Sequence, residues 1–221
     1  MKLKNTLLYL LIALISPALA QETLGINLEG YDYPYPVKEF HFRSQQQDLV
    51  MAYQHEKSPT PNGKTVLLLH GKNFNGAYWG ETVAALLNSG YNVIVPDQIG
   101  FGKSSKPAHY HYTFQQLAEN TEALLKNEGV DEAIVLGHSM GGMLATRYAL
   151  MYPEKTAQLI LLNPIGLEDW KLKVPYVGVD GWYEQELKKT AEGIKKYQLD
   201  SYYFGQWSDQ YGPWVYLLAA P

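Results

Sequence analysis

Short, continuous apolar runs alternate along the chain with longer segments whose apolar residues recur at helical spacing. Continuous apolar runs are typical of strands buried on both faces, and they occur at 65–69, 91–95, 133–136 and 159–162. Helical spacing predicts helices over 76–89, 113–128 and 140–151. Strand–helix–strand units of this length predict an α/β fold with a doubly wound, mostly parallel sheet and helices on both faces.

Two further strands are predicted ahead of this alternation. Residues 37–43 and 48–56 have strand character, and the polar residues 44–47 between them form a turn signal. Residues 21–36 are rich in Gly, Tyr and Pro, which favours an extended lead-in. We therefore expect residues 37–165 to form the N-terminal part of an α/β core.

The character of the chain changes after Gly166. Residues 168–221 hold four of the five tryptophans and seven tyrosines but no apolar strand run. Helical spacing predicts a helix over 186–197, with Glu184 and Lys188 as an i,i+4 ion pair. We expect residues 166–221 to be a helical, aromatic cap region, although an exported binding surface could have the same composition.

Residues 1–20 have the pattern of a secretory signal peptide. Lys2 and Lys4 precede an apolar run over 7–15, and Ala18-Leu19-Ala20 forms a cleavage site. The run is too short to span a bilayer, so we expect an exported protein, periplasmic or secreted, with no stable membrane insertion after cleavage. The alternative is an uncleaved membrane anchor.

Composition narrows the function classes. The formal net charge is −4, and losing the two lysines of residues 1–20 would make it −6, which argues against nucleic-acid binding. The chain has no cysteine, which rules out a disulfide scaffold, a thiol nucleophile and an Fe–S cluster within these residues. His109 and His111 lack neighbouring ligand residues, so we expect no metal site and no cofactor.

The main candidate for chemistry is the sequence Gly137-His138-Ser139-Met140-Gly141. It follows the predicted strand 133–136 directly and opens the predicted helix 140–151. A G-x-S-x-G nucleophile elbow requires this strand–turn–helix setting, which exposes the serine hydroxyl at a strained backbone angle. The helix N-terminus favours a developing negative charge nearby. A glycine-rich turn with an incidental serine is the alternative.

A second candidate loop, His70-Gly71-Lys72-Asn73, follows the predicted strand 65–69. The backbone N–H of Lys72, with that of Asn73 as the alternative, would join the N–H of Met140 to hold an oxyanion. We interpret His70 as a structural histidine, and His138 as bulk beside the nucleophile.

The glycine-rich stretch at 100–105 is a less specific signal. A phosphate-binding Walker A loop would require glycine where Asp97 stands, and a dinucleotide-binding motif would require it where Ser105 stands. Both nucleotide-binding interpretations fail on these residues.

Four motifs together, HGKNFNGAYW, PDQIGFGKSSKP, GHSMGG and LNPIGLEDW, resemble the α/β-hydrolase superfamily. The resemblance is to exported bacterial hydrolases of the esterase, dehalogenase-like and C–C-hydrolase branch, which carry a helical cap. It implies Ser139 as nucleophile, the Met140 and Lys72 amides as the oxyanion hole, and 97–104 as a structural loop. Haloalkane dehalogenases carry aspartate at the position of Ser139, which disfavours their chemistry.

The general base that such a fold requires is not found in these residues. The triad order is Ser, then Asp or Glu, then His, but none of the six histidines follows Ser139. Glu168 and Asp169 could offer a carboxylate, and His70 or His111 a displaced base. We expect the last two strands to be missing, and the chain to be truncated within or just after the cap.

The sequence therefore predicts a serine hydrolase that forms an acyl-enzyme from a small, apolar, ester-like substrate. Its activity is expected to be impaired because the catalytic acid and histidine are absent. The bond cleaved stays open among ester, lactone, C–C and amide. The alternative function is a non-catalytic exported binding protein, or a decayed fragment, on the same fold.

Overall fold

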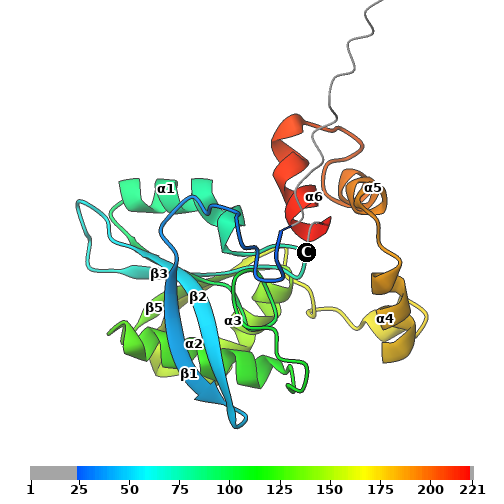
Figure 1. The fold of residues 1–221 in the computed structure, drawn as a ribbon. Helices are drawn as coiled ribbons and strands as arrows, with labels where there is room; N and C mark the ends of the chain where they lie inside the picture. The colour runs from blue at the N-terminus through cyan, green and yellow to red at the C-terminus, as the bar shows by residue number, and fades with distance from the viewer. Residues whose placement is uncertain (1–23, 220–221) are drawn as a thin grey trace, which may run out of the picture.

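A computed structural model describes residues 24–219, and the expected signal peptide lies outside them (Figure 1). Its centre is a six-stranded sheet in the order β1-β2-β4-β3-β5-β6. The strands are β1 (Lys38–Ser44), β2 (Gln47–Glu56), β3 (Thr65–Leu69), β4 (Asn92–Pro96), β5 (Ala133–His138) and β6 (Thr156–Leu162). Among the residues described, no helix is long and apolar enough to cross a membrane.

The sheet is mostly parallel, as predicted. β3 pairs in parallel with β4 and β5, and β5 pairs in parallel with β6. The hairpin of β1 and β2 is antiparallel, and β2 joins β4 antiparallel. At the hairpin turn, Gln45 and Gln46 adopt φ values of 47° and 62°, a left-handed conformation that the polar turn signal did not indicate.

Helices cover both faces of this sheet (Figure 1). One face carries the 3₁₀ turn η1 (Gly76–Trp79) and α1 (Gly80–Asn88), and the other carries α2 (Phe114–Asn127) and α3 (Met140–Met151). A second 3₁₀ turn, η2 (Pro153–Lys155), leads into β6. Strand β3 serves both layers: Leu67 and Leu69 pack in the larger core cluster, whereas Val66 and Leu68 pack with Trp79.

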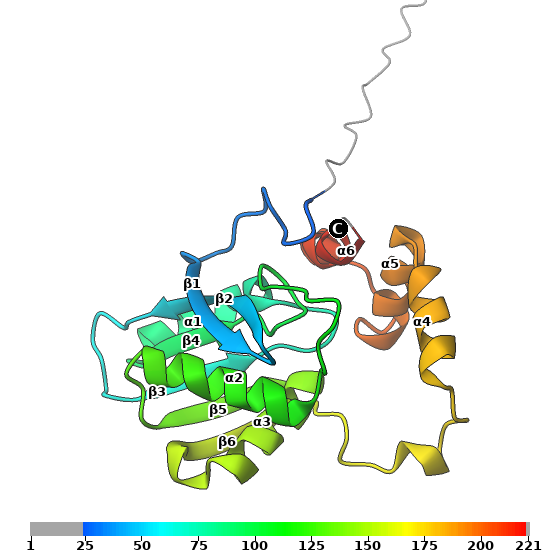
Figure 2. The same ribbon diagram turned by 60° about the horizontal axis from the view of Figure 1, so that its bottom comes forward.

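The region after Gly166 is helical among the residues described. It contains η3 (Trp170–Leu172), α4 (Val179–Leu187), α5 (Ala191–Ser201), η4 (Asp209–Tyr211) and α6 (Gly212–Ala219). Both ribbon views show α4, α5 and α6 grouped beside the sheet-and-helix core (Figures 1 and 2).

The single helix predicted over 186–197 is wrong. The helical segment is interrupted between α4 and α5. There the Thr190 side chain accepts a hydrogen bond from the Gly193 N–H at 3.1 Å and caps the second helix. The expected pair of Glu184 and Lys188 is present at 3.9 Å. A helix-capping threonine therefore overrides an apolar spacing that runs across the break.

The lead-in is not a simple extended segment. Residues 24–37 are irregular, with turns at 26–27 and 29–30 and no strand. Leu28 is buried, and it packs against Ala77 of η1 and Leu217 of α6. The lead-in thus ties the start of the described chain to the last cap helix.

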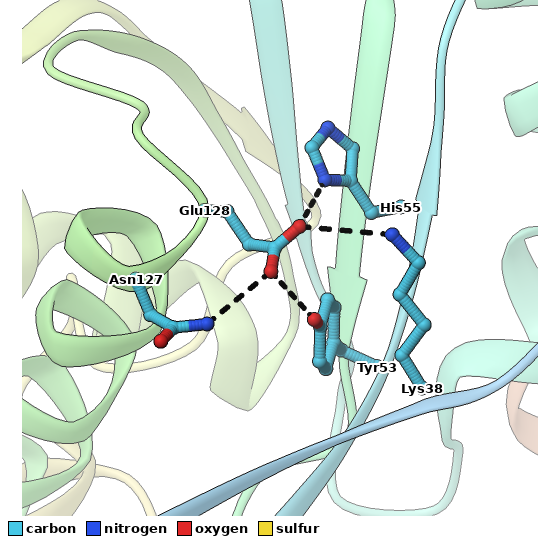
Figure 3. A network of polar contacts seen from close by, with 5 residues as sticks. All are labelled: Lys38, Tyr53, His55, Asn127 and Glu128. Atoms are coloured by element: carbon cyan, nitrogen blue, oxygen red, sulfur yellow. Dashed lines mark hydrogen bonds and ion pairs between the residues drawn. The ribbon is translucent and has the colours of Figure 1, made fainter.

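A polar network closes the end of α2 onto the first two strands (Figure 3). The Glu128 carboxylate accepts a hydrogen bond from the Tyr53 hydroxyl at 2.6 Å, lies 2.5 Å from His55 Nδ1, and pairs with Lys38 at 3.8 Å. Burial raises the pKa of this carboxyl, but the bonds from Tyr53 and His55 outweigh it, so the pKa lies below its ordinary value.

Strand β6 forms one edge of the sheet within residues 24–219. Its apolar side chains are partly open to solvent, and Leu159, Ile160 and Leu162 are 39–44% exposed. An apolar edge strand of this kind presents unpaired backbone groups to any strand that can add to it.

Candidate active site

The backbone at Ser139 has the geometry of a nucleophile elbow. Ser139 lies between β5 and α3 with φ of 55° and ψ of −118°, outside the regions that side-chain-bearing residues favour. Its N–H donates to the Leu162 carbonyl at 3.1 Å, and its own carbonyl accepts from the N–H groups of Gly142 and Ile165. The strained residue is therefore held from both sides by its neighbours.

The two glycines of the motif are required by close packing. A Cβ on Gly137 would lie 2.0 Å from the Gly141 carbonyl oxygen, and a Cβ on Gly141 would lie 2.1 Å from the Leu69 carbonyl oxygen. No side chain fits at either distance. The second contact also brings the end of β3, and the loop that follows it, directly against the elbow.

That loop forms a turn next to Ser139. The Phe74 N–H donates to the Gly71 carbonyl at 3.1 Å, which closes a four-residue turn with Lys72 and Asn73 at its centre. The Lys72 N–H has no hydrogen-bond acceptor among residues 24–219. A Cβ on Gly71 would lie 3.1 Å from the Ser139 Cβ, so the turn and Ser139 are in contact.

Met140 is the first residue of α3. The N–H groups of a first helical turn have no intrahelical acceptor, and the helix dipole adds positive potential there. The amides of Lys72 and Met140 are those that the sequence predicts for an oxyanion hole, and both belong to segments next to Ser139.

His70 is a structural residue, as interpreted from the sequence. Its Nδ1 lies 2.9 Å from the Gly71 carbonyl, and its Nε2 accepts from the Gln98 N–H at 3.0 Å, so both ring nitrogens are engaged. Full burial lowers the pKa of His70, although the charge of Asp97 and the Gly71 carbonyl oppose the shift. The neutral ring holds Gly71, the first residue of the turn at 71–74, and neither of its nitrogens is free to serve as a base.

A cavity of about 340 Å³ opens beside the elbow, over the carboxyl ends of β5 and β6. Parallel α/β sheets bind ligands at this end of their strands. The lining consists of Phe74, Tyr78, His138, Leu162 and Asn163 from the core side and residues 201–204 from the cap.

His138 forms part of this wall rather than mere bulk. Its ring stacks on Tyr78 with centroids 5.8 Å apart, and its Nδ1 is buried without a hydrogen-bond partner in the described part of the chain. Burial, and then the nearby His70, lowers the pKa of His138, so the ring stays neutral near pH 7. Sequence reasoning missed the other lining residues, since only their meeting in three dimensions makes a pocket.

The loop at 97–104 is structural. The buried Asp97 carboxylate accepts hydrogen bonds from the Gly76 N–H at 2.6 Å, the Lys103 N–H at 2.7 Å and the Tyr33 hydroxyl at 2.7 Å. It thereby joins the lead-in, η1 and the glycine-rich loop. No nucleotide-binding role is needed to explain these residues.

The remaining candidate acids and bases are not brought to Ser139. Its hydroxyl has no hydrogen bond to any residue in the range 24–219. The backbone of His111 is bound to Gln45 at the β1–β2 turn. Glu168 pairs with Lys173 at 2.5 Å, and Asp169 caps η3 by accepting from the Lys171 N–H at 3.1 Å.

Comparison with known families agrees with this geometry. Residues 64–194, more than half of the chain, match the model of the alpha/beta hydrolase fold family. The chain belongs to the α/β-hydrolase family. A crystal structure of a probable hydrolytic enzyme from Pseudomonas aeruginosa PAO1 is 54% identical, with a TM-score of 0.88 over 90% of this chain and 64% of that one.

Two curated relatives show how varied the chemistry of similar proteins is. A cis-3-alkyl-4-alkyloxetan-2-one decarboxylase from Shewanella oneidensis is 32% identical over 63% of this chain and 49% of its own length. A 2-hydroxy-6-oxo-6-phenylhexa-2,4-dienoate hydrolase from Burkholderia cepacia is 34% identical over 65% and 51%, respectively. The chain thus spans about half the length of the curated relatives that it matches.

Proposed function

We propose that this α/β hydrolase cleaves small, apolar esters or similar acyl compounds through Ser139. The strained elbow, with φ 55° at Ser139 and the turn at 71–74 packed against it through Gly71, is the observation that carries the proposal. A φ of 55° is unfavourable for a residue with a side chain, and backbone strain of this kind is concentrated at functional sites.

In the proposed reaction, Ser139 Oγ attacks the substrate carbonyl carbon and its proton passes to a general base. The oxygen of the tetrahedral intermediate accepts hydrogen bonds from the Lys72 and Met140 amides. The intermediate collapses and its C–O bond to the alcohol portion breaks while the base returns the proton to the departing oxygen. The neutral alcohol leaves, and the acyl group stays on Ser139. Water then attacks the acyl carbon, which releases the acid and restores the Ser139 hydroxyl.

We propose that the general base lies outside the described residues, in a segment that corresponds to the part of the Pseudomonas enzyme that this chain does not cover. The exposed edge of β6 is suited to receive further strands that would carry it. Without the base, a serine hydroxyl is a poor nucleophile, and we propose that the 221-residue chain alone hydrolyses esters only slowly.

The cavity supports an uncharged substrate. No lysine, arginine, aspartate or glutamate is among the residues that line it, and its histidine is held neutral by burial. Its aromatic walls favour apolar groups, and its volume of about 340 Å³ suits a small molecule.

We also propose that the protein is exported, because residues 1–20 have the pattern of a signal peptide.

Substitution of Ser139 tests the proposal in the protein expressed from its native gene. Ser139→Ala should lower kcat/KM for p-nitrophenyl butyrate by about 10⁴-fold, because the nucleophile is lost while the oxyanion amides remain. The matched control is Ser89→Ala, since the exposed Ser89 hydroxyl, the group that this change removes, donates to the Ala85 carbonyl at the end of α1. In the 221-residue chain alone, Ser139→Ala should change the slow rate little.

The same assay tests the substrate class. The p-nitrophenyl half-ester of succinate has the chain length of the butyrate but adds a carboxylate, whose burial in an uncharged pocket is unfavourable. We expect its kcat/KM to be lower by at least about tenfold. Saturable ligand binding with no ester hydrolysis, unaffected by Ser139→Ala, would instead favour the non-catalytic binding protein.

A further inference from the structure

The turn at 71–74, named the oxyanion turn below, contacts the cap through three consecutive residues. Lys72 Nζ pairs with Glu186 Oε1 of α4 at 2.5 Å, across 114 positions of sequence. Asn73 Nδ2 donates to the Tyr202 hydroxyl at the end of α5 at 3.1 Å, across 129 positions. The ring of Phe74 lies 6.0 Å from that of Tyr202.

The residues that reach the cap belong to the turn that contacts Ser139 through Gly71. Lys72 and Asn73 occupy the centre of the turn closed by the Phe74 N–H, and the Lys72 N–H is the amide proposed for the oxyanion. A side chain fixed to α4 or α5 restricts the φ and ψ angles of its own residue. The position of the cap therefore bears directly on the direction of that N–H.

We propose that Lys72 and Asn73 are positioning residues through which the seated cap holds the oxyanion turn in its active form. With α4 and α5 in place, Glu186 and Tyr202 fix the turn against Ser139, and when the cap lifts, the turn is released. The proposal rests on the proposed function, because it assigns the Lys72 amide a role in that reaction.

The strength of the contacts suits a reversible link. The Lys72 and Glu186 side chains are 55% and 39% exposed, and ion pairs in water of this kind are weak and screened by salt. The Tyr202 hydroxyl is neutral, since burial, and then its bond with Tyr197, raises its pKa to about 12. The cap also contacts the lead-in and η1 through Leu217, so lifting α4 and α5 need not detach α6.

This link also lies beside the substrate cavity. Phe74 belongs to its core wall, and Tyr202 belongs to the cap segment that forms the opposite wall. Substrate that fills the cavity contacts both walls at once. Binding would therefore favour the seated cap and, through Lys72 and Asn73, the ordered turn.

The chain provides matched controls. Glu186 accepts from Lys72 on Oε1 and from Lys189 on Oε2, whereas Glu184 in the same helix pairs only with Lys188 of the cap. Tyr211 stacks on Tyr203 within the cap, and among residues 24–219 its side chain makes no hydrogen bond to the core. The test pair is thus Glu186→Gln with Tyr202→Phe, and the control pair is Glu184→Gln with Tyr211→Phe.

Hydrogen exchange of the backbone amides over 71–75, measured in the full 221-residue chain, tests the contacts of Lys72 and Asn73 with the cap and does not require enzyme activity. The test double variant should exchange at these amides about tenfold faster than the unsubstituted chain, and the control double variant should not. At about 1 M salt the effect of Glu186→Gln alone should disappear, because the ion pair is already screened in the unsubstituted chain.

Kinetics in the native gene product give a second readout. The test variant should lower kcat for p-nitrophenyl butyrate by about tenfold, because the oxyanion contact forms only in the transition state. It should raise KM by less than that factor, because substrate binding favours the seated cap. Equal exchange in the test and control variants would overturn the proposal. Retention of hydrolysis in Ser139→Ala would instead overturn the proposed function, whatever the exchange result.

Discussion

The helices of the core and those of the cap are held by different means. Helix α2 buries Leu117, Leu124 and Leu125 together with three smaller or polar residues, whereas α4 buries none of its nine residues. In the core, the position of a helix is set by buried side chains packed against the sheet. In the cap, it depends on helix caps, aromatic contacts and a few polar links, so its position can change at low cost.

Glycine substitution should show the largest difference between the regions. In Gly137→Ala the new methyl would lie 2.0 Å from the Gly141 carbonyl oxygen, whereas at Gly178, ahead of α4, nothing lies within 4 Å. We expect the first change to lower the free energy of unfolding by more than about 4 kcal/mol, and the second to lower it by less than about 1 kcal/mol. Urea unfolding followed by far-ultraviolet circular dichroism measures both. Comparable losses would mean that the two regions are equally constrained.

Leucine truncation should separate the regions by a smaller amount. Leu144 of α3 is fully buried, and Leu187 of α4 is 67% exposed. Leu144→Ala should lower the free energy of unfolding by about 2–5 kcal/mol through lost burial and a cavity. Leu187→Ala should change it by less than about 0.5 kcal/mol. A large loss at Leu187 would show that α4 is packed more firmly than its exposure indicates.

The pH dependence of stability should show the smallest difference. The pKa values of Glu128 in the core and Glu186 in the cap are both lowered by hydrogen bonds, against the raising effect of burial. A lowered pKa in the folded state stabilises the fold above pH 4.5, and this stabilisation is lost as the pH falls toward the lowered value.

Glu128→Gln should therefore remove on the order of 1–2 kcal/mol at pH 7 and flatten the loss of stability below pH 4.5. Glu186→Gln should do so much less, because its side chain is 39% exposed, against 14% for Glu128. Unfolding midpoints between pH 3 and 7 test this, in steps of about half a unit. An equal acid response in both variants would contradict the ranking.

Much of the core could be predicted from sequence because its signals are local. The apolar run at 65–69 and the helix at 140–151 occur with the predicted bounds, and Thr113 caps α2 by accepting from the Gln116 N–H. The strained backbone at Ser139 could also be predicted, since the glycine spacing after a buried strand restricts the backbone geometry there. Strands β5 and β6 are longer than predicted, because pairing extends them past their apolar residues.

The cap and the pocket could not be predicted to the same extent. The spacing of Leu187, Ala191 and Ile194 fits one helix, but the Thr190 cap divides it into two. The cavity joins Phe74 to residues 201–204, segments far apart in sequence whose aromatic character alone does not say what they face. Contacts such as Asn73 with Tyr202 exist only once the cap is placed.

The most direct test of Ser139 as nucleophile is covalent labelling of the native gene product with a fluorophosphonate. An activated serine oxygen attacks the phosphorus and expels fluoride, which leaves an adduct that peptide mass spectrometry can locate. The account predicts an adduct on the peptide containing Ser139, lost in Ser139→Ala and absent from Ser89. Ester hydrolysis with Ser139 unlabelled, or with the label on another residue, would contradict it.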